Sequence, residues 1–95
     1  MTHLKLPKKV KISDNVLFQH LNNECVLLDM ASEQYFGLND VGARIWQILS
    51  EGDGDAEKTL SLLLSEYETD EATLRADLIN LLTELGNEKL IIIEN

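Results

Sequence analysis

Few side chains in this sequence could carry out chemistry. The histidines His3 and His20 lie far apart, and neither stands at helical spacing from another metal ligand. Cys25 lies in an apolar run, where a thiol is typically a small buried hydrophobe rather than a nucleophile. With one cysteine no internal disulfide can form, which fits a reducing compartment. The sequence therefore predicts neither a zinc site nor a thiol nucleophile.

An acidic stretch with two glycines, Glu51 to Asp55, is the other candidate site. Asp53, Asp55 and Glu57 could bind calcium, but the stretch lacks the twelve-residue pattern that ends in a glutamate. Its glycines do not stand in a strand-to-helix turn that holds phosphate, and the sequence has no nucleophile-elbow, Walker or dinucleotide-binding motif. We interpret the stretch as a solvated linker and predict that the chain is not an enzyme and uses no metal or cofactor.

The charge of the chain restricts its partners. It has 17 acidic and 8 basic residues among 95, a net charge of −9. Such a chain repels phosphate backbones and favours basic or neutral partners. No apolar run reaches the ~18–20 residues that a membrane helix needs, and the polar, basic residues 1–11 are not a secretory signal. We therefore expect a cytoplasmic protein that binds neither nucleic acid nor membrane.

The first elements expected along the chain are three extended segments. Residues 16–21, 24–29 and 33–38 predict short strands, and their connectors are too short for crossover helices, so the strands should pair antiparallel. The connector Asn22-Asn23 tolerates left-handed backbone angles and suits a tight hairpin.

The apolar period then changes to that of a helix. Three helices are expected, with N-caps at Asn39, at Asp55, and at Thr69 or Asp70. The first should run to about Ser50, and the third should reach Leu85 and end at Gly86-Asn87. Residues 90–94 read as a final strand or as an extended segment that covers the core.

This order of elements predicts an α+β fold in which a three-stranded antiparallel sheet is followed by three helices. The same order describes a winged helix-turn-helix. Residues 1–13 lack apolar periodicity and predict a flexible N-terminal arm, whose Val10 and Ile12 could dock on the body. The rest of the chain, residues 14–95, is expected to form one domain.

The third helix is apolar or small over more than half of its circumference. It has one stripe of leucines, a second stripe of small or branched residues on nearly the opposite side, and a polar arc. The leucines are Leu74, Leu78, Leu81, Leu82 and Leu85, the second stripe is Ala72, Ala76, Ile79 and Thr83, and the arc is Asp77, Asn80 and Glu84. Such a helix is either buried by several neighbours or forms the wall of a groove. In a groove, Ile79 would offer an apolar contact and Arg75 a cation for a carboxylate or carbonyl.

The segment over 33–38 has a matching feature. Tyr35 and Phe36 point to opposite faces of a strand, so one ring enters the core and the other needs a different surface. Gly37 beside them lets an incoming backbone come close. At an edge of the sheet, the unpaired N–H and C=O groups of this strand would invite an added strand. The alternative is an ordinary edge strand that Glu33 and the C-terminal tail protect.

The continuous string from Leu27 to Trp46, LLDMASEQYFGLNDVGARIW, resembles the signature of PqqD-like proteins. These proteins are the leader-peptide recognition elements of ribosomal peptide natural-product pathways. Within that group the chain is most similar to the small stand-alone proteins of lasso-peptide clusters. The resemblance extends over about residues 16–93, and the part over 35–46 is the specific one.

The resemblance implies three antiparallel strands and three helices, like a winged helix-turn-helix. It implies that a leader adds as a strand beside residues 33–38, with its apolar side chains in a cleft against the third helix. Carried over by position, the leader-binding residues are Glu33, Gln34, Tyr35, Phe36, Gly37, Leu38, Leu74, Arg75, Leu78, Ile79 and Leu82. The matching residues Asn39, Val41, Gly42, Ile45 and Trp46 are expected to be structural. Many members have a glycine where Glu33 stands, and a glycine is also common near Lys89.

The function that the resemblance implies is non-enzymatic. The chain would bind the leader of a precursor peptide by strand addition and deliver it to a modifying enzyme or a leader peptidase. Two alternatives from other classes stay open. One is a winged-helix transcriptional regulator, although the third helix sets Arg75 alone against Glu71, Asp77 and Glu84. The other is a protein–protein adaptor or homodimer that uses the same edge strand.

Overall fold

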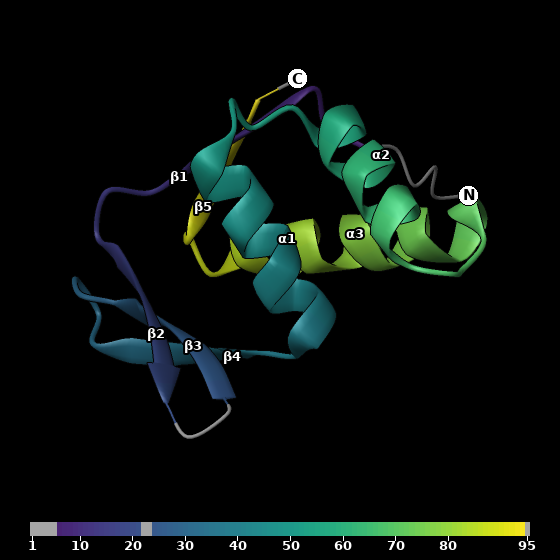
Figure 1. The fold of residues 1–95 in the computed structure, drawn as a ribbon. Coiled ribbons are helices and arrows are strands. Elements are labelled where there is room, and N and C mark those ends of the chain that lie inside the picture. Colours follow the sequence, from purple (N-terminus) through teal and green to yellow (C-terminus); the bar gives the residue numbers. More distant parts are fainter. Residues whose placement is uncertain (1–5, 22–23, 95) are drawn as a thin grey trace.

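The computed structural model describes residues 6–21 and 24–94, so the expected turn at Asn22-Asn23 lies outside the described residues. A three-stranded antiparallel sheet lies beside three helices (Figure 1). Its strands, in the order β2-β3-β4, are β2 (Val16–Leu21), β3 (Glu24–Asp29) and β4 (Gln34–Leu38). This arrangement confirms the expected α+β fold.

The helices are α1 (Asp40–Glu51), α2 (Ala56–Glu66) and α3 (Glu71–Asn87). Each begins after a residue whose side-chain oxygen accepts a hydrogen bond from the backbone N–H three positions on, which satisfies a group that the helix leaves without a partner. The acceptors are Asn39 Oδ1 at 2.7 Å, Asp55 Oδ1 at 3.0 Å and Asp70 Oδ2 at 3.1 Å from the donor nitrogens. The expected caps are therefore confirmed, with Asp70 rather than Thr69 at the third helix.

Part of the expected flexible arm, residues 1–13, is a strand in the structure. β1 (Lys9–Ile12) pairs antiparallel with β5 (Ile91–Glu94), the strand expected in the C-terminal tail. Val10 of β1 is 5% exposed and belongs to the same core cluster as Leu6. The expectation of a loose arm is wrong for this part. Its alternation of lysine and apolar residues is that of a half-buried strand, but the partner strand lies at the far end of the chain.

α3 continues past Gly86 and ends in a Schellman motif. The N–H of Lys89 donates to the carbonyl of Gly86 at 3.1 Å, and the N–H of Leu90 donates to the carbonyl of Leu85 at 2.9 Å. Lys89 has the left-handed φ of 62° on which this motif depends. α3 therefore ends at Asn87, as expected, and the residue in the terminating conformation is Lys89 rather than the glycine.

One side of α3 forms the centre of the core. Its buried residues are Leu74, Leu78, Ile79, Leu82 and Leu85. They belong to one cluster with Leu27 of β3 and with Ile45 and Trp46 of α1, so the cluster joins the sheet to the helices. Burial of these side chains fixes which side of α3 remains accessible beside β4.

Candidate functional site

β4 has a free hydrogen-bonding edge. In its sheet it pairs with β3 alone, and the C-terminal strand β5 pairs with β1 instead. Within residues 6–21 and 24–94, the outer N–H and C=O groups of β4 therefore face no other strand. The alternative of an edge covered by the C-terminal tail is wrong for this structure. An edge of this kind can accept an extended peptide as an additional strand.

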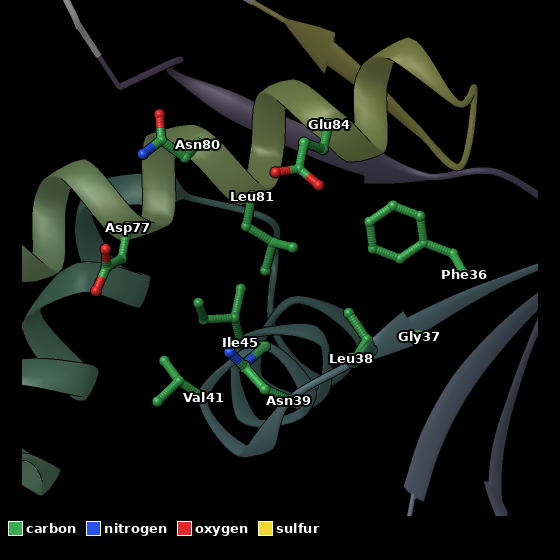
Figure 2. A pocket seen from close by; sticks show the side chains of 11 residues that line it. Phe36, Gly37, Leu38, Asn39, Val41, Ile45, Asp77, Asn80, Leu81 and Glu84 are labelled. Carbon is green, nitrogen blue, oxygen red and sulfur yellow. The ribbon is translucent and has the colours of Figure 1, made fainter.

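A pocket of about 350 Å³ lies beside this edge, between β4, the start of α1 and one side of α3 (Figure 2). We call it the β4–α3 groove. It is lined by Phe36, Gly37, Leu38, Asn39, Val41, Gly42, Ile45, Asp77, Asn80, Leu81 and Glu84. Val41 and Ile45 form an apolar side with Leu81 opposite, and Asp77 and Glu84 lie on α3 to either side of Leu81. A groove with apolar side chains on both walls, next to a free strand edge, suits an extended peptide with apolar side chains.

Close packing fixes the start of α1 against the end of β4. Asn39 Oδ1 accepts a hydrogen bond from the Gly42 N–H at 2.7 Å. A Cβ on Gly42 would lie 3.2 Å from Asn39 Oδ1 and 3.3 Å from Leu38 Cδ2, which is closer than ordinary van der Waals contact. Glycine at this position therefore lets the helix begin directly after the strand, and Val41 and Ile45 consequently line the groove.

The groove carries negative charge. Asp77 and Glu84 are its ionisable residues, and none of the described residues that line it is basic. Arg75, the cation expected there, instead lies 3.0 Å from a Glu57 oxygen and 3.2 Å from a Glu71 oxygen. Its hydrogen bonds to Glu57, which has the larger effect, and to Glu71 raise the pKa of Arg75. The arginine therefore ties α3 to α2 and does not face the groove.

The structure brings part of the expected strand residues to the groove. Phe36, Gly37 and Leu38 line it. Tyr35 alternates to the opposite face and is 64% exposed. Glu33 and Gln34 are exposed at the start of β4 and do not line the groove.

α3 turns a different side to the groove than the resemblance implied. Leu74, Leu78, Ile79 and Leu82 are buried in the core, as expected of a central helix, and the structure does not bring them to the groove. The residues that it brings there, and that the sequence interpretation missed as a site, are Asp77, Asn80, Leu81 and Glu84. Their spacing of i, i+3, i+4 and i+7 is a signal for one helical face. Asp77, Asn80 and Glu84 form the polar arc identified in the sequence, and Leu81 comes from its leucine stripe, so neither pattern alone marks this face as a site.

In the part of the chain that the structure describes, no group of three or more histidine, cysteine, aspartate or glutamate side chains is placed to hold a metal ion. Over the same part, no helix is both long and apolar enough to cross a membrane. Cys25 is a free, partly buried thiol on β3.

Comparison with known proteins gives one consistent result. The family model for coenzyme PQQ synthesis protein D (PqqD) matches residues 24–91. The solved structure of TbiB1 in complex with the TbiA(beta) leader peptide is 41% identical, with a TM-score of 0.77 over 85% of this chain and 93% of that chain. The solved structure of lasso peptide synthetase B1 complexed with the leader peptide is 27% identical, with a TM-score of 0.78 over 88% and 98%. No curated protein matches the chain at a significant level.

Proposed function

This chain belongs to the PqqD family, and on that premise we propose that it binds the leader segment of a ribosomally made precursor peptide of the lasso type. The observation that carries the proposal is the free edge of β4 beside the β4–α3 groove, whose walls carry apolar side chains. The two similar structures are both complexes with a leader peptide, which supports the same role here.

Leader binding combines a backbone ladder with a few side-chain anchors. Each backbone hydrogen bond to β4 contributes about 0.5–1.5 kcal/mol net. Each apolar side chain buried in the β4–α3 groove contributes about 1.5–3 kcal/mol. Ordering a disordered leader costs about 2–5 kcal/mol or more. The ladder therefore sets the register, and two or three anchors decide which leader binds.

The chain has no catalytic step in this role. It holds the leader as an ordered strand and presents the rest of the precursor to a modifying enzyme or a leader peptidase. Because the precursor is made by ribosomes, the proposed role places the protein in the cytoplasm. The net charge of −9 on the chain favours a leader that is neutral or basic.

The two alternative functions have less support. A winged-helix regulator would lay α3 on DNA, but Asp77 and Glu84 on α3 would repel phosphates, and Arg75 is engaged by Glu57 and Glu71. An adaptor or homodimer would join two copies through β4, and light scattering of the free protein would then give twice the mass of the chain.

Fluorescence anisotropy with a labelled TbiA(beta) leader peptide tests the proposed site. Leu81→Asp places a carboxylate in the apolar part of the groove, and we expect binding to weaken at least about tenfold because an anchor loses its contact. Leu62→Asp is the matched control, because Leu62 is 47% exposed on α2 and does not line the groove. Unchanged binding by Leu81→Asp, or an equal loss in both variants, would exclude the groove as the site.

The same assay can test strand addition itself. Alternate N–H groups of an added strand face its neighbour, so every second residue of the leader donates to β4. N-methylation of single leader residues should therefore weaken binding at every second position and spare the positions between. A uniform effect of N-methylation along the leader would contradict an added strand.

A further inference from the structure

The side of α3 that faces the groove carries two carboxylates with an apolar residue between them. Asp77 and Glu84 are seven positions apart, which is about 10 Å along a helix that rises 1.5 Å per residue. Leu81 lies between them on the same face (Figure 2). A peptide strand in the groove would therefore meet a carboxylate towards each end of its apolar contact.

The protein does not neutralise these carboxylates within the described residues. Its arginines are engaged elsewhere, Arg44 with Glu66 at 2.6 Å and Arg75 with Glu57 at 3.0 Å. Lys58 pairs with Asp53 at 3.5 Å. The ion pairs found over residues 6–21 and 24–94 do not include Asp77 or Glu84. Two exposed negative charges therefore remain beside an apolar groove, and a complementary occupant would supply the cations.

From this arrangement, and on the basis of the proposed function, we infer that Asp77 and Glu84 make the β4–α3 groove select leaders with a lysine or arginine two positions from the apolar anchor. Side chains two residues apart on a strand share one face and lie about 6.6 Å apart. If the anchor contacts Leu81, the residues two positions before and after it are directed towards the carboxylates. The long side chains of lysine and arginine span the remaining distance. A leader with aspartate or glutamate there is repelled.

The carboxylates contribute selectivity rather than most of the affinity. They are exposed, so water and salt screen each charge pair, and we expect roughly three- to tenfold in Kd for the two together. The effect should be larger at low salt and should largely disappear at about 0.5 M NaCl, where the screening length is only a few ångströms. The apolar contact with Leu81 should remain at both salt concentrations.

Selection from a displayed library of randomised peptides tests the inference on the intact chain. The wild type is expected to enrich peptides in which a lysine or arginine stands two positions from an apolar residue. Asp77→Asn/Glu84→Gln should lose this basic preference and keep the apolar one. Glu51→Gln/Glu68→Gln is the matched control, because it changes the net charge equally at exposed positions outside the groove and should behave as the wild type.

The outcomes separate the inference from the proposed function. Enrichment of apolar peptides without a basic preference, or a basic preference that survives in Asp77→Asn/Glu84→Gln, would overturn the inference and leave peptide binding intact. A loss of preference in both double variants would assign the effect to net charge and would also overturn it. If the folded wild type enriches no peptide at all, both the inference and the proposed function fail.

Discussion

Glu33 and Lys89 have nearly the same left-handed backbone conformation, with φ of 61° and 62°, although 56 positions separate them. They are the non-glycine residues with positive φ in the part of the chain that the structure describes. Glu33 closes the β3–β4 turn, where its N–H donates to the Asp29 carbonyl at 2.7 Å, and Lys89 terminates α3. This conformation costs a residue with a Cβ about 1–2 kcal/mol, so glycine is the residue that would adopt it most readily at both positions.

Glu33→Gly and Lys89→Gly are each expected to stabilise the protein. The relief of backbone strain exceeds the entropy that glycine adds to the unfolded chain, which leaves a gain of about 0.5–1 kcal/mol. Urea denaturation measures this gain as a higher midpoint, while the slope of the unfolding free energy against urea concentration stays unchanged. The control is Ala76→Gly, which lies in right-handed helix and should lose about 1 kcal/mol. A loss of stability in Glu33→Gly would show that its left-handed backbone carries no strain.

Two glycines near the groove should respond differently to alanine. At Gly42 a Cβ would press on Asn39 Oδ1 and the Leu38 side chain, so Gly42→Ala should weaken the cap and cost about 1 kcal/mol despite the better helix propensity of alanine. At Gly37 a Cβ would meet nothing within 4 Å, so Gly37→Ala should fold with nearly unchanged stability. Thermal unfolding of the two variants side by side makes the comparison. Equal stability would mean that α1 can move away from β4 without cost.

Ile79→Asp should unfold the protein rather than only weaken leader binding. Ile79 is 5% exposed in the core, and an unpaired carboxylate there costs several kcal/mol, a large part of the stability of a domain of this size. Leu81, two positions on, is partly exposed, so Leu81→Asp should keep the fold. Circular dichroism of the two variants distinguishes them. A folded Ile79→Asp would contradict the side of α3 that the structure assigns to the core.

The free energy of unfolding should fall as the pH drops into the range in which carboxylic acids bind protons. A hydrogen bond from Arg44, 2.6 Å long, lowers the pKa of Glu66, and hydrogen bonds from Thr73 lower the pKa of Asp70. The folded pKa values therefore lie below the unfolded ones, so the unfolded state binds protons first. The contribution of these groups is complete above about pH 5 and is lost as the pH falls through the folded values.

Urea midpoints between about pH 6 and pH 3 test this dependence. Glu66→Gln removes one of the titrating groups, so its midpoint should fall less steeply with pH than that of the wild type. Glu68→Gln serves as the control, because Glu68 is exposed and forms no ion pair with any residue that the structure describes. Parallel curves for the wild type and Glu66→Gln would show that the bond to Arg44 does not contribute to stability.

Local signals made most of the fold predictable from the sequence. Asn39, Asp55 and Asp70 each begin a helix because their short side chains accept the first free N–H groups, and this depends on a few neighbouring residues alone. The antiparallel pairing of β2, β3 and β4 also depends on neighbouring residues alone, because the connectors between these strands are too short for crossover helices. β1 was missed because its partner β5 lies at the other end of the chain, and a four-residue strand has little signal of its own.

The groove was only partly predictable, for a different reason. The strand side, from Phe36 to Leu38, follows from the family string. The helix side depends on how α3 is rotated, and a helix with apolar residues on two sides does not fix that rotation by itself. Burial in the core shared by the sheet and the helices decides it, which encloses Ile79 and leaves Leu81 at the groove. Such contacts between distant segments are not visible in local periodicity.

Pairing of Lys9 with Glu94 brings residues near the two ends of the chain side by side. Figure 1 shows the C-terminal end of β5 near the top of the view and β4 near the bottom. A fluorescent protein or an immobilisation tag fused after β5 would therefore be attached away from the edge of β4.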